Sequence, residues 1–283
     1  MIRDDPQLRA GGIEEFSIRI NKIVQPARAV GPMALALADV TVKTSVSAYR
    51  RIHTRNVARC VNRRCKHESP NIELRRCPRC NNAMRTHAIE DAEPLPIPIA
   101  GYDLSTELNT QATWIELGPA VQAVYDAAFW PRWHLPDHEG NAQPHPGFSC
   151  AVASVMGALL KAFPECANCD RDDIAGVHLQ HQTAWRIYVY DNFPQGLGLA
   201  AEMAAEVLPY LQTALEYVER CTCDDTGCPV CLFNFRARQQ TALSKLAARF
   251  VLRHLLAQDT QPVIDDLEMH AGALAPSQLV KRD

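Results

Sequence analysis

Eight of the eleven cysteines in this 283-residue chain fall into two tight groups. The first group is the segment CTCDDTGCPVC (221–231), with the spacing C-x-C-x4-C-x2-C, and Gly227 permits the turn between its two halves. Four thiolates at about 2.3 Å around one tetrahedral ion need short loops of this kind. Since four cysteines leave no coordination position open, the spacing predicts a structural zinc site, with an iron–sulfur cluster or four reduced thiols as the alternatives. The expected ligands are Cys221, Cys223, Cys228 and Cys231.

The second group lies in ARCVNRRCKHESPNIELRRCPRCNNAM, residues 58–84, and has the spacing C-x4-C-x11-C-x2-C. Two cysteine pairs separated by about a dozen residues are typical of a zinc ribbon. His67 could replace Cys65 as a ligand. The expected ligands of this second structural zinc are Cys60, Cys65, Cys77 and Cys80.

Positive charge gathers around this second group. Residues 50–85 hold ten arginines and one lysine against two glutamates, although the whole chain has a formal net charge of −3. Arginine side chains suit phosphate oxygens, so the module is predicted to contact nucleic acid without strong sequence preference. Protein contact and a merely solvated face are the alternatives. The candidate contact residues are Arg63, Arg64, Lys66, Arg75, Arg76 and Arg79.

The elements around these groups indicate an α+β fold. Strand patterns occupy residues 16–23, 36–51 and 185–191, and helix patterns occupy 148–163, 199–220 and 238–257. The 199–220 helix is expected to kink at Pro209. Residues 94–102 read as a proline-rich connector, and residues 131–147 as a loop.

The turn NFPQGLGLA at 192–200 partly matches a dinucleotide-binding fingerprint, Gly196-x-Gly198-x-x-Ala201. The first glycine stands too far from the end of the preceding strand for that motif. A tight turn in which Asp191 accepts backbone hydrogen bonds is the preferred interpretation. Cys166 and Cys169 form a possible third cysteine pair that has no partner pair. We find no Walker motif and no catalytic constellation, so no catalytic residue is assigned and the chain is not expected to be an enzyme.

Several motifs together resemble the C-terminal zinc-binding domain of MrfA/YprA-type DEAD/DEAH-box helicases. They are ADVTVKTSVSAYRR, ELNTQATWIEL, CDRDDIAG, IYVYDNFPQGLGLA and CTCDDTGCPVCL, and they cover roughly residues 14–255. The two RecA-like domains of those helicases have no counterpart in this sequence, and the ribbon resembles an insertion. The resemblance implies partnership with a DEAD/DEAH-type helicase and with DNA, in repair or in phage defence, where DrmB-like subunits of DISARM are related.

These observations combine into one expectation. The fold is α+β, with a small mixed or antiparallel sheet, packed helices, a four-cysteine zinc site joining two helices, and an inserted zinc ribbon. The protein is expected to be a non-catalytic accessory subunit of a DNA helicase complex, or alternatively a stand-alone zinc-dependent DNA-binding protein. No apolar run of 18 residues and no signal-like start are seen, so a cytoplasmic protein without a membrane-spanning helix is expected. The expected parts are a flexible terminus (1–12), a zinc-binding domain (13–52 and 91–258), the basic ribbon (53–90) and a tail (259–283).

Overall fold

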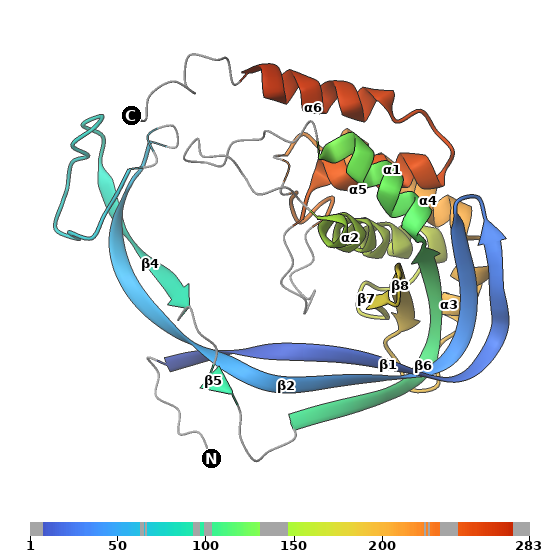
Figure 1. The fold of residues 1–283 in the computed structure, drawn as a ribbon. Coiled ribbons are helices and arrows are strands. Elements are labelled where there is room, and N and C mark those ends of the chain that lie inside the picture. Colours follow the sequence, from blue (N-terminus) through green and yellow to red (C-terminus); the bar gives the residue numbers. More distant parts are fainter. Residues whose placement is uncertain are drawn as a thin grey trace. The chain divides into compact units, whose positions relative to one another are not determined.

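The structure is a computed structural model of strands and helices (Figure 1). The chain divides into two compact units, and strands of the sheet continue from one unit into the other. It describes residues 8–62, 65, 67–92, 97–98, 104–130, 147–223, 225, 227–232 and 243–273. Unit 1 comprises Met1–Phe16 and Thr44–Thr106, and unit 2 comprises Ser17–Lys43 and Glu107–Asp283.

The described residues form eight strands and six helices, which confirms the predicted α+β class. The strands are β1 (Leu8–Val30), β2 (Met33–Cys60), β3 (Glu68–Ser69), β4 (Met84–Ala92), β5 (Ile97–Pro98), β6 (Leu104–Leu117), β7 (Ile174–His181) and β8 (Ala184–Asp191). The helices are α1 (Pro119–Phe129), α2 (Phe148–Ala167), α3 (Leu199–Ala205), α4 (Val207–Arg220), α5 (Lys245–Leu255) and α6 (Gln261–Ala273).

In unit 2 the strand order is β1-β2-β6-β8-β7. Strand β8 pairs antiparallel with both β6 and β7, and Ile115 stands opposite Ile187. Both isoleucines are fully buried, because every second residue of these strands faces the helices. The sheet therefore supplies one apolar face to the core.

Helix α2 is the centre of that core. It packs against β7 and β8 on one side and against α4 and α5 on the other (Figure 1). The sequence predicts that this helix ends near Phe163, but it continues through Pro164 and stops at Asn168, whose φ is 49°. A left-handed asparagine is a common helix stop.

Helix α2 bears on the expectation that the chain has no membrane-spanning helix. It is long and apolar enough to do so by length and composition. In this structure, however, 67% of its most apolar 18-residue window is buried inside the protein. Its hydropathy is explained by its position between the sheet and the other helices.

The predicted 199–220 helix is two helices. The chain leaves helical geometry at Glu206 (φ −137°), which separates α3 from α4, and not at Pro209. Pro209 lies in the first turn of α4, where a backbone N–H would have no partner within the helix, so proline fits there. The predicted 238–257 helix appears as α5, and residues 233–242 lie outside the described part of the chain.

The two ends of the chain also differ from expectation. Residues 259–283 were expected to be a tail, whereas α6 forms at Gln261–Ala273 and buries Val263 and Leu267 completely or nearly so. Strand β1 begins at Leu8, within the expected flexible terminus. Most of the predicted 131–147 loop lies outside the described residues, as does most of the predicted connector at 94–102.

In unit 1 a β-hairpin carries the cysteine module. Strands β2 and β4 pair antiparallel from Ile52↔Ala92 to Cys60↔Met84, and short β3 also pairs with β2. Cys60 is thus the last residue of a strand, and the module closes the end of the hairpin. The pairing of β2 with β4 therefore fixes the backbone position of Cys60, the first of the four cysteines.

Candidate metal centres

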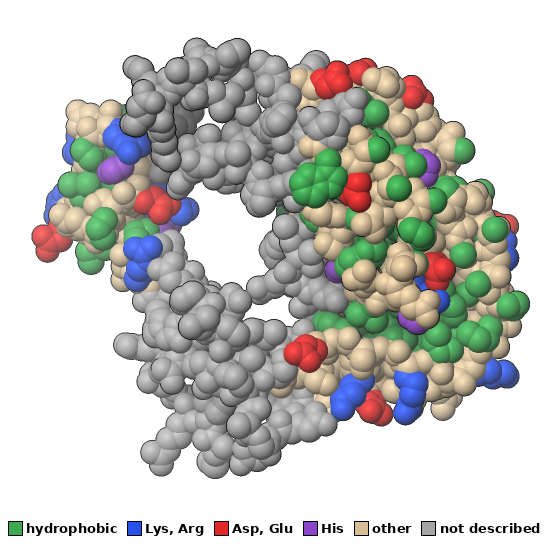
Figure 2. Space-filling view, in the orientation of Figure 1, with side chains coloured by type: hydrophobic (Ala, Val, Ile, Leu, Met, Phe, Trp, Pro, Cys, Tyr) green, Lys and Arg blue, Asp and Glu red, His purple; other side chains and the backbone are tan. Residues whose placement is uncertain are grey.

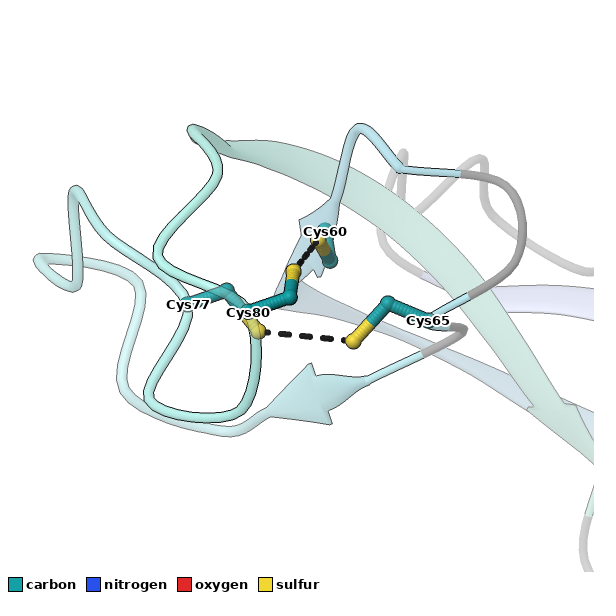
Figure 3. Close-up of side chains that lie close together, drawn as sticks. All are labelled: Cys60, Cys65, Cys77 and Cys80. Carbon is teal, nitrogen blue, oxygen red and sulfur yellow. Dashed lines mark hydrogen bonds between the residues drawn. The ribbon is translucent and has the colours of Figure 1, made fainter.

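The four cysteines of the ribbon lie together at the end of the β2–β4 hairpin (Figure 3). Their sulfur atoms are all within 4.8 Å of one another. The Sγ atoms of Cys60 and Cys80 are 3.4 Å apart, and those of Cys65 and Cys77 are 3.6 Å apart. Ligands at about 2.3 Å from a tetrahedral ion stand roughly 3.8 Å from each other, so these separations fit one mononuclear site.

Backbone hydrogen bonds shape the two turns of the ribbon. The N–H of Cys60 donates to the carbonyl oxygen of His67 (2.9 Å), and the N–H of Asn81 donates to that of Cys77 (2.8 Å). Asn81 has a φ of 58°, which lets the second turn close tightly. The sulfur cluster contains the four cysteines and not His67, whose backbone rather than its side chain shapes the turn.

Local hydrogen bonds distribute the thiol pKa values of the ribbon unevenly. The side-chain amide and the backbone N–H of Asn82 lower the pKa of Cys80 to about 6. Burial raises the pKa of Cys60 to about 12. The thiol of Cys80 therefore loses its proton most readily, whereas that of Cys60 loses its proton only when a cation binds.

The second cluster joins the end of α4 to the start of α5. The Sγ atoms of Cys221 and Cys228 are 3.5 Å apart, and those of Cys223 and Cys231 are also 3.5 Å apart. All four sulfurs lie within 4.8 Å of one another. Cys231 is fully buried in the main core, so this cluster belongs to the packed interior of unit 2.

Lys245 and Asp225 connect this cluster to α5. The Lys245 ammonium donates to the carbonyl oxygens of Cys221 (2.9 Å) and Cys223 (2.5 Å). The Asp225 carboxylate accepts from the N–H of Leu246 (2.8 Å) in the first turn of α5. The sequence analysis did not select either residue, because their roles depend on contacts across about twenty positions of chain.

Two glycines allow the cysteine loop to sit against the core. A Cβ atom at Gly157 of α2 would lie 2.6 Å from the carbonyl oxygen of Leu232. Gly227 has a φ of 79°, and a Cβ there would lie 2.9 Å from the Cβ of Leu232. The absence of a side chain at Gly157 lets the loop approach α2 this closely, and its absence at Gly227 lets the loop fold back against its own Leu232.

The thiol pKa values of this cluster also diverge. Burial raises the pKa of Cys228, but hydrogen bonds from the N–H groups of Val230 and Cys231 more than offset it and hold the value at about 6. Burial raises the pKa of Cys223. Both clusters thus provide four closely spaced sulfurs and a closed ligand shell, and both fit structural zinc sites.

The predicted contact residues are only partly within the described chain. Arg75, Arg76 and Arg79 are exposed, and Figure 2 shows basic side chains at the surface of this module. The Arg76 guanidinium donates to the carbonyl oxygen of Asn81 (3.1 Å) and so supports the second turn. The remaining three, Arg63, Arg64 and Lys66, lie outside the described residues.

The glycine turn has the geometry expected from the sequence. Asp191 is fully buried, and its carboxylate accepts hydrogen bonds from the N–H groups of Leu197 (2.5 Å), Gly198 (2.7 Å) and Ala200 (2.7 Å). These N–H groups lie at the N-terminus of α3, which is where a dinucleotide phosphate would bind. The carboxylate already fills that position, so the turn serves the fold.

Comparison with known proteins agrees with the cysteine geometry. Residues 155–232 match the family model described as "MrfA Zn-binding domain". The "Uncharacterized ATP-dependent helicase YprA" of Bacillus subtilis (strain 168) is 24% identical over 129 residues, which are 44% of this chain and 15% of that protein.

Solved structures of MrfA also match. The "DUF1998 helicase MrfA bound to DNA" aligns with a TM-score of 0.49 and 17% identity over 88% of this chain and 26% of that one. The same helicase bound to DNA and AMPPNP aligns with a TM-score of 0.40 and 16% identity over 87% and 22%. This chain thus spans about a quarter or less of the length of these relatives. The family match at 155–232 includes all four cysteines of the 221–231 cluster and supports an MrfA-type zinc-binding domain in this chain, as the sequence motifs predicted.

Proposed function

We propose that this protein is a non-catalytic zinc-binding accessory subunit of a DNA helicase complex, to which it contributes nucleic-acid and partner contacts. The observation that carries the proposal is the closed four-cysteine cluster at 221–231 inside the segment that matches the MrfA Zn-binding domain. Relatives that share this similarity are named as helicases, and one is described as bound to DNA. A closed thiolate shell holds structure and offers no position for a reacting water.

Under this proposal the two parts of the chain have different roles. The zinc-binding domain (13–52 and 91–258) docks on the motor subunit, and the inserted ribbon (53–90) contacts nucleic acid. The complex works in the cytoplasm, either in DNA repair or in a phage-defence system of the DISARM type. A separate motor subunit supplies the ATPase.

The test is native affinity purification of the protein from its source cell, followed by mass spectrometry of the co-purified proteins. We expect a stoichiometric partner that carries Walker motifs. A zinc-loaded protein that purifies without such a partner would contradict the accessory-subunit proposal.

The ribbon favours a second candidate, a stand-alone zinc-dependent DNA-binding protein. Arg75 and Arg79 are exposed beside a metal site that would fix their backbone, and no described residue pairs with either side chain. Arginine forks in a fixed position suit phosphate oxygens. Such binding weakens as salt rises, because each phosphate contact releases counterions.

A DNA titration tests this role of the ribbon. The double variant Arg75→Gln/Arg79→Gln should bind a short duplex or single strand more weakly, and its salt dependence should be shallower by roughly two phosphate contacts. Arg76 is left in place because it supports the turn at Asn81. Arg171→Gln, at an exposed arginine of unit 2, is the matched control. Equal affinity of the double variant and the wild type would assign the ribbon to protein contact.

A further inference from the structure

One lysine of unit 2 lies in the protein interior. Lys161 of α2 is only 9% exposed, and it is the one lysine or arginine that is buried among the residues that the structure describes. Long charged side chains are almost never buried unless a partner compensates their charge. Lys161, however, makes no hydrogen bond or ion pair with any described residue. Its burial therefore requires an explanation.

The geometry of α2 directs Lys161 toward the 221–231 cluster. Gly157 stands one turn before Lys161 on the same face of the helix, and the carbonyl oxygen of Leu232 approaches α2 at that glycine. Side chains of an α-helix lean toward its N-terminus, so the Lys161 side chain is directed back over the turn of Gly157. Leu232 directly follows Cys231, the last cysteine of the cluster. The buried ammonium therefore faces the cysteine loop.

The electrostatic surroundings of Lys161 identify its partner. Burial, and then the positive charge of Arg171, lower the pKa of Lys161. The sulfurs of Cys228 and Cys231 act in the opposite direction and favour the charged ammonium. The negative charge that this buried ammonium needs is therefore that of cysteine thiolates.

A second lysine flanks the other half of the cluster. The Lys245 ammonium lies 4.0 Å from the Sγ atom of Cys223, and it also donates to the carbonyl oxygens of Cys221 and Cys223. The cluster thus has an ammonium group from α5 beside its first two cysteines and an ammonium group from α2 directed toward its last two.

The charge of a zinc–thiolate cluster accounts for two lysines at this place. A divalent ion with four thiolates carries a net charge of −2, and a buried charge of that size requires compensation. Two ammonium groups supply the opposite charge, so the loaded cluster and its lysines are neutral together. Beside neutral thiols, by contrast, Lys161 would be an uncompensated buried cation with a like charge, Arg171, near it. The burial of Lys161 is thus explained by thiolates and not by thiols.

We propose that Lys161 is the buried counter-ion of the zinc site at 221–231, and that Lys245 is the counter-ion of the other half of that site. Lys161 stabilises the thiolate form of the ligands, and it attaches α2 to the cysteine loop by charge as well as by packing. The inference rests on the zinc site and not on the helicase-subunit function.

The test measures zinc release from each cluster of the full-length zinc-loaded chain. A competing chelator is added in steps, the freed cysteines are alkylated with N-ethylmaleimide, and mass spectrometry identifies which cluster has lost its metal. We expect Lys161→Met, which keeps the length of the side chain but removes its charge, to lower the zinc affinity of the 221–231 cluster about ten- to a hundredfold. The ribbon cluster should release zinc as in the wild type, because Lys161 belongs to unit 2 and the ribbon cysteines belong to unit 1.

Two further variants separate charge from packing. Lys161→Arg keeps the charge and should retain the zinc affinity within about threefold. Lys22→Met, at an exposed lysine of β1, is the matched control and should change the zinc affinity of neither cluster.

Three results would overturn the proposal. A Lys161→Met protein that binds zinc at 221–231 as tightly as the wild type, or more tightly, would show that Lys161 is an unpaired buried charge, since an apolar replacement of such a charge is often stabilising. An equal loss of affinity in Lys161→Met and Lys161→Arg would show that the shape of the side chain matters and not its charge. A wild-type protein that holds no zinc at these cysteines would refute the zinc site and this inference together.

Discussion

Replacing Gly157 with alanine sets two physical effects against each other. Within a helix, glycine to alanine normally stabilises by about 1 kcal/mol, because alanine loses less backbone entropy. Here the new Cβ would lie 2.6 Å from the carbonyl oxygen of Leu232, which directly follows the last cysteine of the second cluster. The neighbouring atom belongs to the backbone of a loop that zinc would hold, so it cannot move aside cheaply.

Overpacking of a core costs about 1–3 kcal/mol, and more where the obstacle is rigid. We therefore expect Gly157→Ala to lower the free energy of unfolding by about 1–2 kcal/mol after the helical gain is subtracted. Urea unfolding of the zinc-loaded protein measures this change. A competing chelator should also remove zinc from the 221–231 cluster more readily than in the wild type.

The matched control is Gly118→Ala, where a Cβ atom would meet nothing within 4 Å. Its stability should change by less than about 0.5 kcal/mol. A Gly157→Ala protein that is more stable than the wild type would refute the reasoning, since it would show that the loop yields without cost. Such a result would also mean that the loop does not need its close approach to α2.

Other substitutions test the remaining features. Cys228→Ser should reduce bound zinc from two ions to one per chain, measured by atomic emission, and should strongly destabilise unit 2 because structural zinc supplies folding energy; two ions retained would contradict the site. Lys245→Met should cost about 1–3 kcal/mol in urea unfolding, because it leaves two carbonyl oxygens of the cysteine loop without a donor. Asp191→Asn should cost about 2–3 kcal/mol, since three N–H groups lose a charged acceptor, and an unchanged midpoint would refute the capping role. Zinc affinity, measured by chelator competition, should fall steadily from pH 7 to pH 5: the thiols with the lowest pKa values, Cys80 and Cys228 at about 6, become protonated in this range, and the raised thiols must already lose protons to bind metal. An affinity that does not change with pH would exclude thiolate ligands.

The cysteine spacing and the Asp191 turn could be read from the sequence because their geometry is local. Ligands a few residues apart must close short loops, and the carboxylate of Asp191 lies within nine residues of every N–H that it binds. The β-branched and aromatic residues at 185–191 similarly predicted a strand, which the structure confirms at Ala184–Asp191. In these cases neighbouring residues alone determine the backbone path.

Other features depend on distant packing and were therefore missed. The apolar residues of helix α6 are spread around the helix more evenly than those of α4 or α5, so its amphipathic pattern is weak, and its Val263 and Leu267 become buried only because other elements cover them. The break at Glu206 leaves no local signal, whereas Pro209 gave a misleading one. Lys245 could not be selected either, because its partners lie more than twenty residues earlier in the chain.

The second cysteine cluster has a consequence for the order of folding. Its ligands span only eleven residues, so closing this loop costs little chain entropy. The hydrogen bonds between Asp225 and the start of α5 join positions that are only about twenty residues apart. Docking of α2, by contrast, must bring Gly157 to Leu232 across seventy-five positions. Metal capture can thus join the end of α4 to the start of α5 early, and α2 then packs onto a surface that has already formed.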